Sequence, residues 1–254
     1  EYLGTIEINK NLIIIGKSES YTPTIIDGFN QVQCILIQNE GFVQFINLNF
    51  KNGLGLNNEA GALHCNGSAL IYVENCNFID NASLDGNGGA INAENIEIYQ
   101  SNFFGNEAYN SGGAVHGKNI SVHNSTFTNN TAINLNGGGI YSEGTSEINF
   151  SLFNNNHSGS KGGGIHSVLS SVDIINNTFY QNSANQGGGI SGYQANLNIQ
   201  NTILWDNIAL LEGDQIYRFS GILDINYSDI LGGYEGTGNI NQDPQFFNAS
   251  AGLF

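Results

Sequence analysis

The sequence has few charged residues, very few basic ones and no long apolar run. Only 11% of its 254 residues are charged, and 6 Lys and Arg stand against 22 Asp and Glu, which gives a formal net charge of −16. This balance opposes binding to a phosphate backbone or to an anionic membrane surface, so nucleic acid is not an expected partner. Because no run of 18 apolar residues occurs, this segment is not expected to insert into a membrane as a helix.

Methionine is absent, proline occurs twice and cysteine three times, at Cys34, Cys65 and Cys76. No Cys-x-x-Cys spacing accompanies the cysteines, so we expect small buried core residues and neither a cofactor nor a metal site. A Cys34–Cys65 bridge is the alternative, if those two segments stack. The chain opens at Glu1 without Met and without a leader, which indicates a mature product or an excised segment.

Glycine and asparagine are abundant, and they recur in two alternating motifs. A glycine motif returns every 24 or 25 residues, and each copy is followed by an aromatic or leucine with Asn three residues later. The copies are Gly88-Gly-Ala-Ile91, Gly112-Gly-Ala-Val115, Gly137-Gly-Gly-Ile140, Gly162-Gly-Gly-Ile165 and Gly187-Gly-Gly-Ile190, alternating with Phe103-x-x-Asn106, Phe127-x-x-Asn130, Phe153-x-x-Asn156, Phe179-x-x-Asn182 and Leu204-x-x-Asn207. A fixed period of this length indicates a stacked array of equivalent units.

Apolar residues within each unit alternate with a period of two, and none recur at helical spacing over three turns. The pattern predicts an all-β fold, a single-stranded parallel β-helix of about nine rungs with a C-terminal cap. We expect the phenylalanines to stack in the core and each motif glycine to supply a positive φ at a corner. The Asn that follows each phenylalanine is expected in the left-handed turn position.

A nearly continuous amide column is predicted three residues before each anchor residue, at Asn47, Asn75, Gln100, Asn124, Asn176 and Asn201, with Phe150 and Tyr227 as its two other members. Stacked amides of this kind form hydrogen-bonded ladders at a bend.

The chain is expected to form one elongated domain over residues 1–254. Residues 1–53 form the N-terminal rungs and residues 54–60 a polar insertion, because Phe50 and Phe78 lie 28 apart. Residues 61–230 form regular rungs of about 25 residues, and residues 231–254 form the cap.

The two motifs between Gly61 and Asn207 resemble those of chlamydial polymorphic outer-membrane protein passengers and of bacterial right-handed parallel β-helix repeat proteins. The closing segment, from Asn226 to Phe246, is similar to the end of secreted β-helix proteins of Bacteroidota-type bacteria. This resemblance implies a right-handed coil and an extracellular or outer-surface location on a bacterium. For activity the motifs are weak evidence, since one fold hosts adhesins, lyases and hydrolases.

Catalytic chemistry finds little support. Pectate-lyase-like enzymes resemble one another in using carboxylates for calcium and a basic residue, yet Arg218 is the only arginine and the lysines are scattered. Hydrolases need carboxylates over one cleft, which only Asp206, Asp224 and Asp229 could supply from adjacent rungs. We therefore name no catalytic residue.

One column follows directly after the glycine motifs and is expected to face solvent as a flat row. Its residues are His64, Asn92, His116, Tyr141, His166, Ser191 and Tyr217. His and Tyr in a row suit sugar stacking or weak metal binding, but His116 and His166 lie two rungs apart, about 10 Å, too far for one metal ion. A polar outer face with no ligand is the simpler interpretation.

The sequence thus favours a secreted or cell-surface structural or adhesive module that presents a surface to glycan or to another surface protein, without catalysis. The alternative is a polysaccharide lyase or glycoside hydrolase acting in a groove along the β-helix. An ice- or mineral-binding surface is a third hypothesis, and the mixed outer columns argue against a lattice match.

Overall fold

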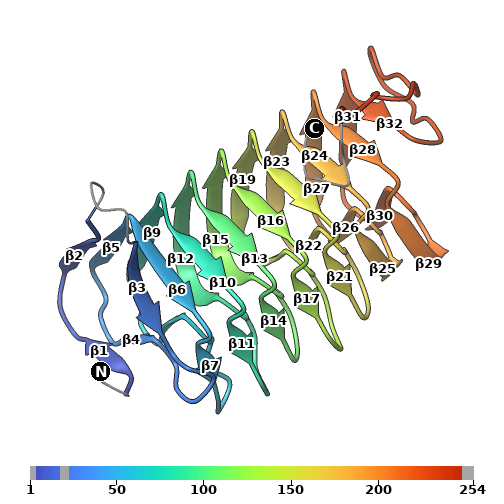
Figure 1. Cartoon of the computed structure of the whole chain (residues 1–254). Coiled ribbons are helices and arrows are strands. Elements are labelled where there is room, and N and C mark those ends of the chain that lie inside the picture. The colour runs from blue at the N-terminus through green and yellow to red at the C-terminus, as the bar shows by residue number, and fades with distance from the viewer. Residues whose placement is uncertain (1–3, 18–22, 248–254) are drawn as a thin grey trace.

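The computed structural model describes residues 4–17 and 23–247, and these contain strands, turns and no helix. The strands stack side by side along one axis into a rod (Figure 1). Every strand pair is parallel and joins equivalent positions of successive turns.

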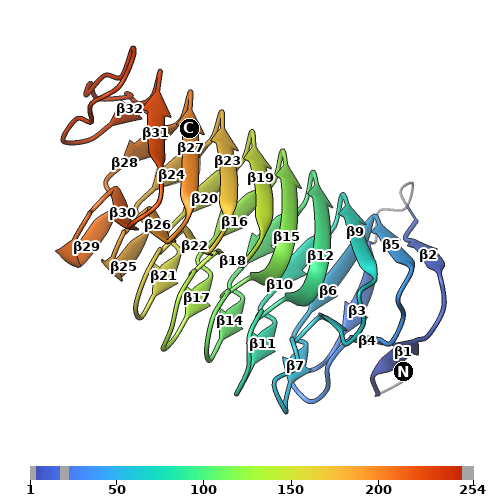
Figure 2. The same cartoon turned by 180° about the vertical axis from the view of Figure 1, so that it is seen from behind.

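The longest sheet has sixteen strands and forms two adjoining faces of the rod (Figure 2). One face contains β1 (Ile6–Ile8), β4 (Ile35–Ile37), β8 (Leu63–Cys65), β12 (Ile91–Tyr99), β15 (Val115–His123), β18 (Ile140–Ser142), β22 (Ile165–Val168), β26 (Ile190–Tyr193) and β30 (Ile216–Phe219). The other contains β2 (Leu12–Ile15), β5 (Phe42–Ile46), β9 (Leu70–Glu74), β19 (Thr145–Asn149), β23 (Ser171–Ile175), β27 (Asn196–Gln200) and β31 (Leu223–Asn226). The nine-residue strands β12 and β15 run through both faces.

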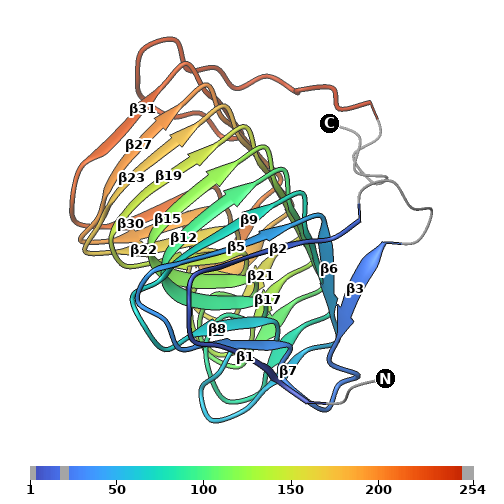
Figure 3. The same ribbon diagram turned by 90° about the vertical axis from the view of Figure 1, so that its left-hand side faces the viewer.

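Two further sheets complete the cross-section. The nine-stranded sheet consists of β3 (Thr24–Asp27), β6 (Leu48–Lys51), β10 (Asn77–Ile79), β13 (Asn102–Phe104), β16 (Thr126–Thr128), β20 (Leu152–Asn154), β24 (Thr178–Tyr180), β28 (Ile203–Trp205) and β32 (Asp229–Ile230). The seven-stranded sheet consists of β7 (Leu54–Gly55), β11 (Ala82–Ser83), β14 (Glu107–Ala108), β17 (Thr131–Ala132), β21 (His157–Ser158), β25 (Ser183–Gln186) and β29 (Ile208–Glu212). Figure 3 looks along the stack and shows successive turns lying over one another.

In the nine-stranded sheet, one turn of chain separates each strand from the next, which makes eight turns. The predicted parallel β-solenoid of about nine rungs is therefore confirmed. The predicted insertion, residues 54–60, begins with β7, the first strand of the seven-stranded sheet. Its residues Asn57 and Asn58 donate backbone hydrogen bonds to the Asp85 carboxylate of the next turn.

The predicted phenylalanine stack fills the core. Phe103 pairs in register with Phe78 and Phe127, and its ring centroid lies 4.6 and 4.7 Å from theirs, with the planes nearly parallel. The stack continues through Phe153 and Phe179, and all of these side chains are fully buried. Apolar burial on this scale stabilises each rung against its neighbours.

The glycine motif forms the predicted corner. Its first glycine has a positive φ in each copy, for example Gly112 at 68°. A Cβ on the second glycine would strike backbone, since at Gly138 it would lie 2.3 Å from the Gly163 carbonyl oxygen. Successive turns therefore approach too closely there for any side chain.

The expectation for the Asn after each phenylalanine was wrong. The left-handed residue is the one before it, such as Asn129 with a φ of 57°, whereas Asn130 is fully buried. The Asn130 Oδ1 accepts hydrogen bonds from the backbone and side-chain amides of Asn106, and its Nδ2 donates to the Phe103 carbonyl and to Asn156. Asparagine is favoured because one side chain both accepts and donates, and so bonds the turns on either side.

This buried amide column has one member per turn, and the glutamine at its C-terminal end closes it. The column is Asn81, Asn106, Asn130, Asn156, Asn182 and Asn207, with Gln215 bonded to the last.

The amide column predicted three residues before the aromatic does mark a bend, because each of its residues has a positive φ. Among the described residues it forms one side-chain rung bond, from Asn75 to Asn47, and so is not the continuous ladder expected. A second ladder lies one residue further on, where Ser101 donates its N–H to the Ser125 Oγ and Ser125 donates to Ser151.

The C-terminal segment covers part of the last turn. Asn239 extends the serine ladder by accepting the Ser228 N–H, and Ile240 pairs with β32. The predicted cap, residues 231–254, thus contacts the last turn at Asn239 and Ile240, and its residues 248–254 lie outside the described residues.

All three cysteines are buried and free, so they are the small core residues expected, and no Cys34–Cys65 bridge forms. Burial raises the pKa of the Cys34 thiol to about 12 and that of Cys76 to about 11, which keeps both thiols protonated.

Candidate functional site

The row predicted after the glycine motifs exists as one residue per turn. Register pairs join His64 to Asn92, Asn92 to His116, and His116 to Tyr141. The row continues through His166, Ser191 and Tyr217 on the next three turns. Period-two alternation places these residues opposite the buried Ile and Val that precede them.

The expectation of a uniformly solvent-facing row was wrong. His64 is 8% exposed, His166 is 2% exposed and Ser191 is fully buried, while Asn92, His116, Tyr141 and Tyr217 are half-buried. The cause is the corner, since a Cβ on Gly112 would lie 2.9 Å from the His116 Cβ. The incoming chain thus folds across the outer side of the row, which period-two alternation alone does not reveal.

The rings of the row stack on one another. The His116 and Tyr141 ring centroids lie 4.9 Å apart with planes 3° apart, and those of Tyr141 and His166 lie 5.7 Å apart. The sequence suggested that a sugar could stack on the rings of the row. It cannot stack flat on Tyr141, because the His116 and His166 rings occupy the two faces of that ring. Contact through ring edges and polar atoms is what this arrangement offers.

Hydrogen bonds fix the histidines. The His116 Nδ1 lies 3.0 Å from the Asn92 Oδ1, which only accepts, so Nδ1 carries the proton and Nε2 is left as an acceptor. A cavity of about 230 Å³ opens beside His116 and Asn92, and Glu94, Lys118 and Glu143 also line it. The Tyr141 hydroxyl donates to Glu143 at 3.0 Å.

Burial lowers the pKa of His116 to about 4 and, with the nearby Lys161 charge, that of His166 to about 3. Burial also lowers the pKa of His64. The three histidines of the row are therefore uncharged at neutral pH. His166 contacts the Ser191 Oγ at 3.1 Å, but Ser191 is fully buried and so is inaccessible as a nucleophile.

The three aspartates considered for hydrolysis lie on different parts of the cross-section. Asp224 is in β31, Asp229 is in β32, and Asp206 follows β28 at a corner. A cavity of about 770 Å³ is lined by Asp206 and Asp214 and includes neither of the other two. The structure does not bring the trio together over one cleft.

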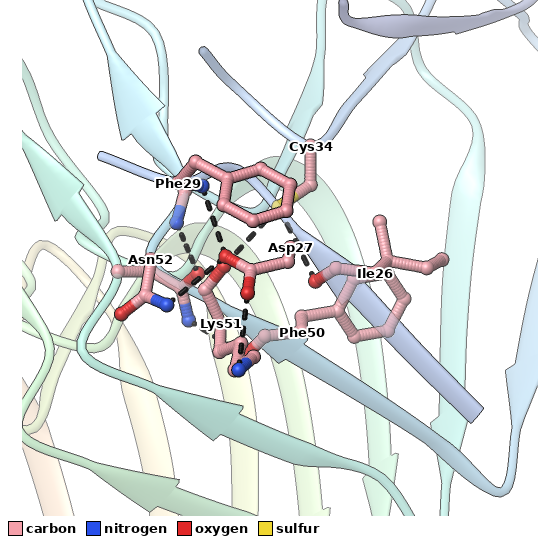
Figure 4. A network of polar contacts seen from close by, with 9 residues as sticks. Ile26, Asp27, Phe29, Cys34, Phe50, Lys51 and Asn52 are labelled. Carbon is pink, nitrogen blue, oxygen red and sulfur yellow. Dashed lines mark hydrogen bonds and ion pairs between the residues drawn. The ribbon is translucent and has the colours of Figure 1, made fainter. Parts of the chain in front are cut away.

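The Lys51–Asp27 pair joins a basic residue to a carboxylate, with 3.0 Å between Nζ and Oδ2 (Figure 4). The other Asp27 oxygen accepts from the Asn52 side chain and the Phe29 N–H. Burial raises the pKa of Asp27, but these hydrogen bonds and Lys51 outweigh it and hold the pKa below its usual range. Both oxygens are occupied, so the pair fixes β3 to β6.

Among residues 4–17 and 23–247, no group of three or more His, Cys, Asp or Glu is arranged to hold a metal ion. In the same part of the chain, no helix has the length and apolarity needed to cross a membrane.

A family model described as Chlamydia polymorphic membrane protein repeat matches residues 124–143 and 150–168. These two stretches are similar to repeats of that kind, and they lie within the parallel β-solenoid described above. The matched stretches run from one aromatic segment to the next glycine corner, and so contain both halves of the predicted motif. Searches of curated proteins and of solved structures each found no match to the chain.

One surface feature was missed from the sequence. A groove of about 400 Å³ lies on the outer side of β12, β15, β19 and β23. Its carboxylates, Glu97, Glu147 and Asp173, are spaced irregularly along the chain, and only the strand register places them in one column.

Proposed function

We propose that this protein is a non-catalytic module displayed outside a bacterial cell, whose outer wall contacts a glycan or another surface protein. The polymorphic-membrane-protein repeats support a surface-exposed, passenger-like role. The filled interior supports it as well, because stacked phenylalanines from Phe50 to Phe179, bonded amides and other buried apolar side chains occupy it and leave the wall as the contact surface.

The observation that carries this proposal is the contrast between constant inner columns and a variable outer row. The inner column repeats asparagine on six successive turns, whereas the row changes from His to Asn to Tyr. A rigid scaffold that holds different polar groups at regular spacing suits recognition by many weak contacts.

The contact residues we propose in the row are Asn92, His116, Tyr141 and Tyr217, which are half-buried and not fully covered. His116 supplies an acceptor and Tyr141 a hydroxyl, both uncharged at neutral pH. His64 and His166 are covered, and we propose that they support the row by stacking and hydrogen bonding.

The test is retention of host-like epithelial cells by immobilised protein. The row variant replaces Asn92, His116 and Tyr141 with alanine. The control variant replaces Asn102, Thr126 and Leu152 with alanine, because these residues point outward from the nine-stranded sheet on the same three turns. We expect the row variant to lose retention and the control to keep it. Equal retention by both variants, or no retention by the unmodified protein, would overturn the proposal.

A further inference from the structure

The groove on the outer side of the sixteen-stranded sheet crosses several turns of the rod. Its lining residues come from β9, β12, β15, β19 and β23. The floor is formed by the strands, where Ile96 and Ile120 are buried. The groove therefore runs along the axis, across the strands, and its length grows with each turn that it crosses.

Two parallel columns of polar side chains flank it. The first column is Asn95, Asn119 and Thr145, and the second is Glu97, Ser121, Glu147 and Asp173. Neighbours within a column are one turn apart, about 4.8 Å, and the two columns are two residues apart along each strand, about 6.6 Å. A linear molecule lying in the groove would meet polar groups on both sides at every turn.

These side chains are held in place by bonds that leave polar atoms free. The Asn119 Nδ2 donates to Asn95 Oδ1, and the Asn95 Nδ2 donates to the Ser68 carbonyl. One oxygen of Glu147 accepts from Asn149, and one oxygen of Asp173 accepts from Asn198. Within residues 4–17 and 23–247, the second oxygen of each carboxylate has no hydrogen-bond partner, and both residues are exposed. Preorganised acceptors reduce the entropy lost on binding.

The charge of the groove selects among ligands. Three carboxylates and no Lys, Arg or His line it, and the chain as a whole carries −16. Polyuronates, sulfated glycans and nucleic acids are repelled. Carboxylates, amides and hydroxyls together match the hydroxyls of an uncharged sugar, which donate and accept at once.

Aromatic rings lie at the N-terminal end of the second column, just beyond the residues that line the groove. Tyr72 pairs in register with Glu97, and its ring stacks on Tyr99 with 5.2 Å between centroids. Its hydroxyl donates to Glu74 at 3.1 Å. A pyranose has apolar C–H groups beside polar hydroxyls, and an apolar ring edge beside polar acceptors complements such a surface.

We propose that this groove binds a neutral polysaccharide chain lying lengthwise along the rod. The inference rests on the proposed function in taking the outer wall as the contact surface, and it adds a ligand class and a site separate from the row. The chain lies across the strands, so each added turn contributes further hydrogen bonds.

The experiment is titration calorimetry of the whole protein with neutral hexasaccharides of β-glucan, mannan and xylan, alongside oligogalacturonate and hexalysine. The groove variant is the double substitution Glu147→Gln and Asp173→Asn. The matched control is Asp224→Asn, because Asp224 belongs to the same column, accepts from Asn226 in a similar way and lies outside the groove. Unchanged thermal midpoints establish that both variants fold.

We expect at least one neutral hexasaccharide to bind, with affinity falling about 10-fold or more in the groove variant and less than about 2-fold in the control. No binding of any neutral hexasaccharide, equal loss in both variants, or binding of hexalysine alone would overturn the inference. If the groove variant retains cells as well as the unmodified protein does, the row proposal stands independently of the groove. If the unmodified protein binds the sugar but retains no cells, the row proposal is rejected and the groove proposal stands.

Discussion

The buried asparagine column and the outer row run through the same turns, yet one repeats a single residue and the other does not. Asn106, Asn130 and Asn156 each bond to the turn on either side, so any other residue would leave buried amides without partners. His116 and Tyr141 contact their neighbours mainly by ring stacking, which several planar side chains supply. Repetition within this sequence therefore marks positions that hold the stack together, and variation marks the wall that is free to differ.

The largest expected effect on stability comes from Phe127→Ala, which opens a cavity inside the phenylalanine stack. We expect the free energy of unfolding in urea to fall by about 3–5 kcal/mol. The control is Phe104→Ala, whose side chain is 47% exposed, with an expected loss below about 1 kcal/mol. Similar losses in the two variants would break the distinction between inner and outer positions.

Asn130→Ala tests the amide column itself. It leaves the Asn106 backbone N–H and the Phe103 carbonyl without their side-chain partner in a buried site, so we expect about 3 kcal/mol of destabilisation by urea unfolding. Asn134→Ala, on an exposed loop, is expected to change stability by less than about 0.5 kcal/mol. A column variant as stable as the loop variant would show that the ladder is not what selects asparagine.

The pH dependence of stability tests the covered part of the row. His166 has a pKa of about 3 in the folded protein and an ordinary pKa near 6.5 in the unfolded chain. As pH falls below 6.5, His166 therefore binds a proton in the unfolded chain and stays neutral in the folded protein. Stability contributed by neutral His166 is complete above pH 6.5 and should fall by about 2 kcal/mol between pH 7 and pH 5. His166→Gln should reduce the measured fall in stability by about that amount and leave the part contributed by His116 and His64. His157→Gln, at an exposed site, is the control. An unchanged slope in His166→Gln would mean that His166 is not buried.

The smallest effect is expected for Tyr141→Phe, which removes only the hydroxyl that bonds Glu143. Cell retention should weaken about 2- to 10-fold, because one hydrogen bond is lost, while stability changes by less than about 1 kcal/mol. Tyr109→Phe, on an exposed loop, is the control. Retention that is insensitive to Tyr141→Phe would remove the hydroxyl from the proposed contact surface.

The sequence alone predicts the solenoid because its period, the glycine corner and the aromatic stack are local and recur on every turn. The Gly112 φ and the Phe103–Phe127 stack follow directly from residue type and spacing. The position of Asn130 did not follow, because asparagine is suited both to a left-handed turn and to a buried ladder. Only the path of the chain shows that Asn129 takes the turn and Asn130 points inward.

The candidate site was less predictable than the fold. Alternation identified the row from His64 to Tyr217, but the cover over His166 comes from chain that arrives through the glycine corner, beyond the reach of a period-two pattern. The groove was missed because Glu97, Glu147 and Asp173 belong to three separate turns and show no common motif. Predicting the cover over the row and the position of the groove both required the strand register between successive turns.

The most direct measurement of that register is the pattern of nuclear Overhauser effects between phenylalanine rings in protein labelled only at phenylalanine. Phe103 should give strong contacts to Phe78 and Phe127, whose centroids lie 4.6 and 4.7 Å away, and Phe127 should continue them to Phe153 at 4.8 Å. Contacts of each ring only with residues of its own turn, with none between Phe103 and Phe127, would contradict the stacked solenoid and every column derived from it.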